Sequence, residues 1–160
     1  EAWQLLESEE DSVHLLEWFD DWEEVGGLSI SNADWEQVLQ IRSEVNKHIE
    51  EARNKEIIGS SLDAKIELYC KEETKILLEK FSDELRFVFI TSEASVEEFQ
   101  EKGDETNLED MRIVVSKTNY QKCVRCWHSR PEVGSIKNHE SICNRCHENI
   151  EGDGEIRNFA

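Results

Sequence analysis

Two Cys-x-x-Cys pairs, Cys123 with Cys126 and Cys143 with Cys146, are separated by sixteen residues. Two thiolates three positions apart on a tight turn point the same way, so each pair can hold one side of a tetrahedral Zn²⁺ ion. Four cysteine ligands leave no open coordination position for water or substrate. The spacing therefore predicts one structural zinc ion with no catalytic role.

Disulfides or redox-active pairs are the alternatives. Disulfides need an oxidising compartment, and the residues from Glu1 to Gln4 begin neither a signal peptide nor a membrane span. A thioredoxin-like motif would occur as one pair within a strand–helix unit, whereas this segment is polar and carries two matched pairs. The nearby histidines could substitute as ligands, but four cysteines suffice, and we expect surface positions for His128, His139 and His147.

The chain has 160 residues and a formal net charge of -19, which suits one or two small domains. No stretch approaches the roughly 18 apolar residues of a membrane helix, so we expect a soluble, cytoplasmic protein. Nucleic acid repels a polyanion, but the charge is uneven. Residues 1–30 carry ten Asp/Glu and no Lys/Arg, whereas residues 119–160 carry six of each. The acidity therefore does not belong to the cysteine segment.

Apolar periodicity predicts helices and strands between the acidic segment and the cysteines. Ser31 or Asn32 can cap a helix that runs to about Lys55. Its expected inward stripe is Trp35, Val38, Leu39, Arg42, Val45, Ile49 and Ala52, and Cys70 is expected as a small core residue. In the second helix we expect Ile76, Leu77 and Phe81 to face inward. The predicted elements are helices over 31–55 and 72–81 and strands over 64–70, 86–91 and 111–116, with no clear pattern over 92–109.

The acidic segment is also aromatic, with Trp3, Trp18 and Trp22 among its first 22 residues. Its periodicity is poor and Gly26-Gly27 interrupts it. We expect an irregular segment whose tryptophans pack on a surface upstream in a longer protein.

Cations and one aromatic residue crowd the first cysteine pair, which suggests RNA. Single-stranded bases need a flat face for stacking and cations for phosphates, and Trp127 beside a rigid metal site supplies such a face. The residues alone leave an equal alternative, in which Trp127 is core and the cations are solvated. The candidate RNA-binding residues are Lys122, Arg125, Trp127, His128, Arg130 and Arg157.

Short motifs occur in order along the chain: Ser12-Val13-His14-Leu15, Trp35, Arg42-Ser43-Glu44-Val45-Asn46-Lys47, Glu50, Arg53, Ile58-Gly59-Ser60-Ser61-Leu62-Asp63-Ala64, Asp83-Glu84-Leu85-Arg86-Phe87-Val88, Lys122-Cys123-Val124-Arg125-Cys126-Trp127 and Gly152-Asp153-Gly154-Glu155-Ile156-Arg157. Together they resemble the C-terminal region of bacterial isoleucyl-tRNA synthetases. One departure is Trp18-Phe19-Asp20, where the family leads us to expect a proline.

The resemblance implies an α+β fold in three parts: the end of a helical anticodon-binding domain (1–60), a small α/β junction domain (61–118) and a zinc-binding module (119–160). It implies that the module grips the anticodon end of an isoleucine-specific tRNA, with the tryptophan after the second cysteine meeting the anticodon loop. ATP-dependent aminoacylation would occur in a distant Rossmann domain of the same monomeric polypeptide. The family's His-x-Gly-His and Lys-Met-Ser-Lys-Ser signatures are absent from this sequence, so we assign no catalytic residue.

Two other classes remain as alternatives. Formamidopyrimidine-DNA glycosylases end in a similar four-cysteine finger, but they use an N-terminal proline as nucleophile, and the only proline here is Pro131. A zinc-stapled protein-interaction domain would also suit the acidic surface.

Overall fold

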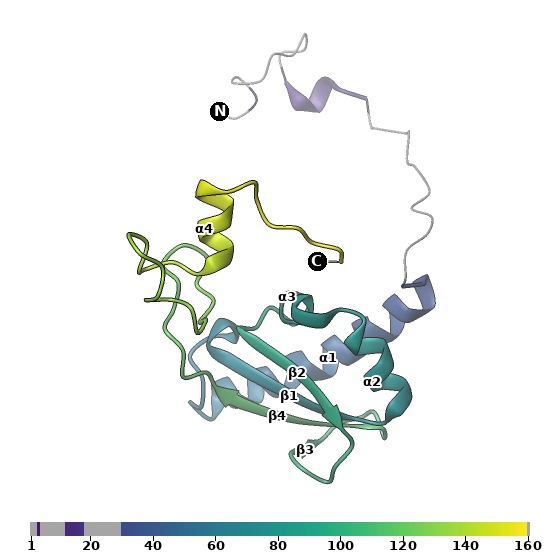
Figure 1. The fold of residues 1–160 in the computed structure, drawn as a ribbon. Coiled ribbons are helices and arrows are strands. Elements are labelled where there is room, and N and C mark those ends of the chain that lie inside the picture. Colours follow the sequence, from purple (N-terminus) through teal and green to yellow (C-terminus); the bar gives the residue numbers. More distant parts are fainter. Residues whose placement is uncertain (1–2, 4–11, 18–29, 160) are drawn as a thin grey trace.

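A computed structural model describes residue 3 and residues 12–17 and 30–159 (Figure 1). Trp18, Trp22 and most of the acidic segment lie outside the described residues, and the expected packing of the tryptophans on an upstream surface stays a prediction. The described elements are single-turn helices at Val13–Leu15, Ser61–Asp63 and Ser82–Glu84, helices α1 (Asn32–Asn54), α2 (Glu72–Glu79), α3 (Leu85–Phe89) and α4 (Asn144–Glu151), and strands β1 (Ala64–Cys70), β2 (Glu93–Glu98), β3 (Asp104–Glu105) and β4 (Met111–Lys117).

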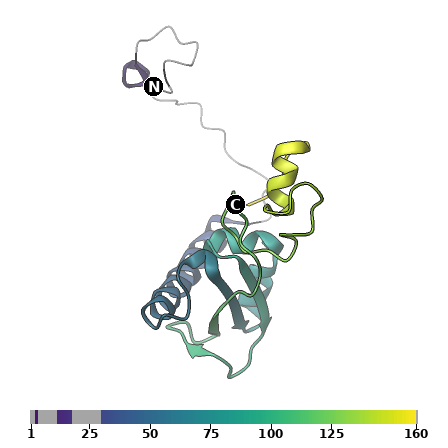
Figure 2. The ribbon, with the colours of Figure 1, turned by 90° about the vertical axis from the view of Figure 1, so that its left-hand side faces the viewer.

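The four strands form one mixed sheet in the order β2-β1-β4-β3. β1 pairs in parallel with β2 and antiparallel with β4. A parallel pair needs a crossover connection, and α2 and α3 provide it. Ala64, Ile66 and Leu68 of β1 are fully buried and share one hydrophobic core with α1, α2 and α3, so these helices cover one face of the sheet (Figure 2).

Helix α1 begins with a reciprocal cap, as the sequence predicts. The backbone N–H of Ser31 donates to Asp34 Oδ2 over 2.9 Å, and the N–H of Asp34 donates to Ser31 Oγ over 3.2 Å. These bonds satisfy two of the donors that a helix start leaves open. The predicted strands over 64–70 and 111–116 and the predicted second helix are also confirmed.

The predicted strand over 86–91 is wrong, because these residues form most of α3 and its end. Leu85, Val88 and Phe89 are buried together at helical spacing. Ile90 then ends the helix with a left-handed φ of 56°. A short run of aromatic and β-branched residues fits either a strand or a buried helix, and packing against the sheet decides here.

Strand β2 lies beside β1, within the residues 92–109 for which we predicted no element. Ala94 and Val96 pack against the core between more polar neighbours, an alternation that could have identified the strand. Two inward assignments are also wrong: Ile76 on α2 and Leu39 on the α1 stripe are both about half exposed, while Thr74 and Leu78 are buried instead. Cys70 is a buried free thiol, as predicted.

Residues 119–159, here called the zinc module, have a small hydrophobic cluster of their own, separate from the core of residues 30–118, here called the sheet unit. Together, the sheet, the helices and a group of four cysteines confirm the α+β class. The division into domains at 60/61 and 118/119 stays a prediction, and α1 shares its core with the sheet. Among the described helices, none is long and apolar enough to cross a membrane.

Candidate metal centre and nucleic-acid interface

The four predicted cysteines converge on one point. Their sulfur atoms lie within 4.8 Å of one another, with Cys123 Sγ 3.7 Å from Cys146 Sγ and Cys126 Sγ 3.6 Å from Cys143 Sγ. Tetrahedral zinc with Zn–S bonds of about 2.3 Å would place the sulfurs about 3.8 Å apart. The donor set and its spacing therefore suit one zinc ion. All five cysteines of the chain are free thiols, which argues against the disulfide alternative.

Backbone hydrogen bonds shape the first cysteine pair as a tight knuckle. Cys123 N–H donates to the His128 carbonyl over 2.9 Å, and Trp127 N–H donates back to the Cys123 carbonyl over 2.9 Å. Trp127 has a left-handed φ of 66°, which closes the turn. Val124 N–H donates to the Ser141 carbonyl over 3.0 Å and so ties the knuckle to the second pair.

The second cysteine pair lies at the start of α4. Cys143 is the residue before the helix and Cys146 is in its first turn. His147 N–H donates to the Cys143 carbonyl over 2.9 Å as the helix begins. Helical geometry therefore sets the separation of these two thiols, because the residues either side of the first turn lie on one face.

The surroundings shift the pKa values of the thiols in opposite directions. Burial opposes ionisation of Cys123, but backbone N–H donors lower the pKa of its thiol to about 6. Burial raises the pKa values of Cys126 and Cys143. A zinc ion with four thiolates carries a net charge of about −2, and a guanidinium is positioned to offset part of it, since Arg125 Nη1 donates to Cys146 Sγ over 3.7 Å. Metal binding would therefore release protons at this centre.

Three predicted RNA-binding residues lie on or beside the knuckle surface. Trp127 is 63% exposed, which excludes the alternative that it is core. Arg125 is exposed beside the sulfur atoms. Lys122 is exposed and pairs with Asp63 Oδ1 over 2.9 Å, and this bond lowers the pKa of the Asp63 carboxyl.

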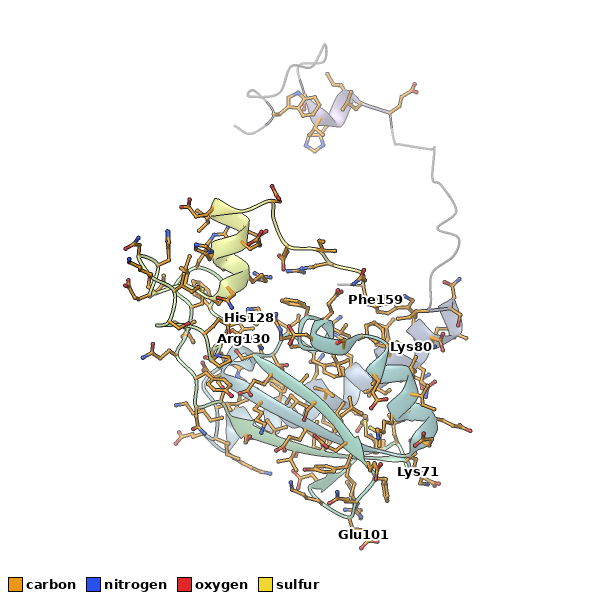
Figure 3. All side chains as sticks on the ribbon, in the orientation of Figure 1. Lys71, Lys80, Glu101, His128, Arg130 and Phe159 are labelled. Carbon is orange, nitrogen blue, oxygen red and sulfur yellow. The ribbon has the colours of Figure 1, made fainter. Side chains whose placement is uncertain are left out.

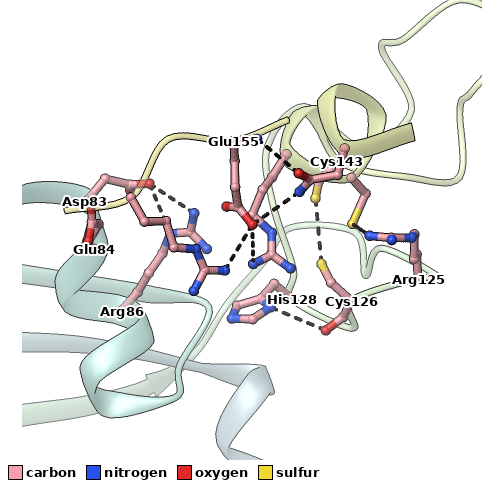
Figure 4. Close-up of polar contacts among 12 residues, drawn as sticks. Asp83, Glu84, Arg86, Arg125, Cys126, His128, Cys143 and Glu155 are labelled. Carbon is pink, nitrogen blue, oxygen red and sulfur yellow. Dashed lines mark hydrogen bonds and ion pairs between the residues drawn. The ribbon is translucent and has the colours of Figure 1, made fainter. Parts of the chain in front are cut away.

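The other three candidates, His128, Arg130 and Arg157, lie in a separate cluster that contacts residues 83–87 of the sheet unit. Figure 3 labels His128 and Arg130 on this side of the module, and Figure 4 shows His128 in close-up. The expected surface position of His128 is wrong: it is only 9% exposed, and its ring meets Phe87 edge to face at 5.6 Å. Burial, followed by the charges of nearby arginines, lowers its pKa to about 4, so the imidazole is neutral at pH 7. Arg130 pairs with Asp83 over 3.6 Å.

Arg157 belongs to the same cluster, which sequence reasoning did not identify as a unit. Its guanidinium lies 4.1 Å from the Phe87 ring centroid, and its Nη2 lies 3.1 Å from Glu155 Oε1. Phe87 and Glu155 fall in two of the motifs quoted above, but nothing in their spacing places them together. His139 Nε2 lies 3.6 Å from Glu151 Oε1, and its ring meets that of His147 edge to face at 5.1 Å, outside the group of four sulfurs.

Comparison with known proteins identifies the segment with the four cysteines as a zinc finger. Residues 121–149 match the family model described as a zinc finger found in FPG and IleRS. Over its whole length the chain matches the C-terminal region of isoleucine–tRNA ligases: it is 42% identical to that of Acinetobacter baylyi and 44% identical to those of two Shewanella strains, ANA-3 and MR-7. All of the chain is covered in each case, but it spans only 17 to 18% of these relatives. These matches confirm the resemblance found in the motifs.

Proposed function

We propose that this chain is the zinc-containing, tRNA-binding part of an isoleucine–tRNA ligase and that it binds the anticodon end of isoleucine-specific tRNA. The observation that carries the proposal is the identity of 42 to 44% along the entire chain. The finger model alone could not carry it, because its description includes both FPG and IleRS. Because the match to the ligases covers the whole of this chain, it favours the ligase over the glycosylase and the protein-interaction domain.

The zinc centre has a structural role in this proposal. Its four positions are taken by thiolates, so the metal would offer no site for substrate and would hold the knuckle in shape. ATP-dependent attachment of isoleucine would be performed by other parts of the same polypeptide. A monomeric state and a cytoplasmic location also remain predictions.

Trp127 is the main RNA contact that we propose. Its ring is exposed on a turn that the metal makes rigid, and anticodon bases are unstacked and available to an aromatic face. Arg125 and Lys122 flank it as candidate phosphate contacts, although each also has a partner within the protein. His128, Arg130 and Arg157 have their observed partners around Phe87, so direct RNA contact by them stays a prediction.

Direct binding of the 160-residue chain to RNA tests the proposal. We expect the zinc-loaded chain to bind an isoleucine tRNA anticodon stem–loop more tightly than a stem–loop of equal length with a different anticodon, measured at one fixed salt concentration. Duplex DNA of equal charge, with and without an oxidised base, is the control for the glycosylase alternative. Equal affinity for both stem–loops, or preference for the damaged duplex, would contradict the proposal.

A further inference from the structure

A buried hydroxyl joins the zinc module to the sheet unit. Ser92, which precedes β2, is fully buried. Its Oγ donates to the Leu62 carbonyl over 2.5 Å and accepts the N–H of Ser129 over 2.6 Å. Arg130 Nη1 adds a bond of 3.2 Å to the Ser92 carbonyl. Ser92 is therefore the hydrogen-bonding centre between the knuckle and the loops beside β1 and β2.

The Phe87 ring of the sheet unit makes cation–π contacts with arginines of both the sheet unit and the zinc module. The guanidinium carbons of Arg86, Arg157 and Arg145 lie 4.0, 4.1 and 5.2 Å from the Phe87 ring centroid. Arg86 belongs to α3, whereas the other two belong to the zinc module. Such contacts are strongest where water is excluded, and Arg86 is 7% exposed. Phe87 is thus a shared platform across the boundary.

The C-terminal tail attaches the end of the zinc module to the sheet unit. After α4 the chain returns over α3 (Figure 1). There the Glu84 carboxylate accepts the N–H groups of Asn158 and Phe159 over 2.8 and 2.7 Å. The Phe159 ring packs 5.1 Å from Phe81 in the core of the sheet unit. We call the contacts of Ser92, Phe87 and Glu84 the docking interface.

The arginines around Phe87 could instead form a binding site for phosphate. The cleft between the tail and α3 has a volume of about 840 Å³, but it is lined by five Lys/Arg and five Asp/Glu side chains. Asp83 lies 3.0 Å from Arg86, and Glu155 lies 3.1 Å from Arg157. The charges therefore balance within the protein, which suits a contact between two units better than a site for an anion.

The docking interface includes His128 and Ser129, the two residues immediately after Trp127. His128 lies against Phe87, and Ser129 donates to Ser92, while Trp127 itself projects into solvent. We propose that Phe87 and Ser92 are positioning residues, which hold the zinc module in one orientation so that Trp127 faces RNA in a fixed direction. This inference rests on the proposed function, and neither residue contacts the RNA.

Phe87→Leu and Ser92→Ala test the docking itself without RNA. The first keeps much of the apolar volume but removes the aromatic face, and the second removes one hydroxyl. Residual dipolar couplings and ¹⁵N relaxation of the zinc-loaded chain should show the module and the sheet unit moving as one body in the parent and separately in both variants. Phe87→Tyr, which keeps the aromatic face, should restore the parent behaviour.

Phe99→Leu is a matched control, since Phe99 also carries a cation, with Lys71 Nζ 5.7 Å from its ring centroid, and is partly exposed on the sheet unit. It should change neither the motion nor the RNA affinity. Ser43→Ala, on the exposed surface of α1, is the corresponding control for Ser92.

RNA binding then tests the positioning role. Both docking variants should retain zinc and bind the anticodon stem–loop about threefold to tenfold more weakly, because only part of the population would present Trp127 correctly. In a Trp127→Ala background the same substitutions should have no further effect, because they act through Trp127.

The outcomes separate the two proposals. If the parent chain does not bind the stem–loop, the proposed function fails, and the positioning role fails with it. If the parent binds and the variants bind equally well, or if the losses add fully to that of Trp127→Ala, only the positioning role is overturned. Parent-like motion in both variants would overturn the docking role of Phe87 and Ser92, whatever the RNA result.

Discussion

Trp127 shows what a single residue can reveal and what its sequence context hides. The spacing of the cysteines identified the four thiols that the structure brings together, because tetrahedral coordination restricts which thiols can share an ion. The same segment could not decide whether Trp127 was core or surface. Its left-handed φ of 66° and the bond from its N–H to the Cys123 carbonyl turn the ring outward. That orientation depends on the folded knuckle and is absent from local sequence patterns.

Trp127→Ala should weaken binding of the anticodon stem–loop by about tenfold to a hundredfold, since stacking of one base on an aromatic ring contributes about 1 to 3 kcal/mol. Trp127→Phe should keep most of the affinity. Lys122→Ala should cause a smaller loss of affinity, because Lys122 already pairs with Asp63. This loss should shrink as salt rises, as expected for a phosphate contact. Zinc content must be measured in each variant, since a collapsed knuckle would imitate a lost contact. Parent affinity in zinc-loaded Trp127→Ala would remove Trp127 from the RNA surface.

At the scale of elements, the sequence predicted those with a long or regular pattern. α1, β1 and β4 follow directly from their periodicity and, for α1, from the cap at Ser31. α3 was missed because its short apolar run fits either a strand or a buried helix, and β2 was missed because its two core-facing residues, Ala94 and Val96, lie within a mostly polar stretch. The docking interface was missed for a stronger reason. Phe87 and Ser92 are close to each other in sequence, but Ser129, Arg157 and the C-terminal tail lie far along the chain from them, and only the tertiary fold brings these partners together.

The end of α3 gives a direct test of helix against strand. Ile90 is 49% exposed and has a left-handed φ of 56°, a conformation that a β-branched residue adopts at a penalty of about 1 to 2 kcal/mol and that asparagine tolerates. We therefore expect Ile90→Asn to leave the free energy of unfolding unchanged or to raise it by up to about 1 kcal/mol. Val88→Asn should lower it by about 2 to 3 kcal/mol, because Val88 is 8% exposed in the core. Urea denaturation of both variants measures this, and a large loss in Ile90→Asn would contradict the turn.

At the scale of the whole molecule, the two units depend on different sources of stability. The sheet unit has a core of nineteen buried residues, whereas the cluster of the zinc module contains Val133 and Ile142 besides three of the four cysteines. Two buried aliphatic side chains are a small core for a segment of this length. We therefore expect the metal to supply much of the free energy that folds the module, as structural zinc does in small domains.

Removal of the metal should consequently unfold one unit and spare the other. We expect Cys126→Ser, or a strong chelator under reducing conditions, to unfold the chain from about residue 119 onward, while α1, β1 and the elements up to β4 keep most of their structure. Amide hydrogen exchange should show lost protection across α4 and kept protection in β1. Because the tail reaches Glu84 and Phe81, protection should also fall locally around α3. Metal analysis of the parent should give about one zinc per chain. A reduced parent chain that folds fully with no zinc, or a chelated chain that keeps α4 protected, would contradict this account of the module.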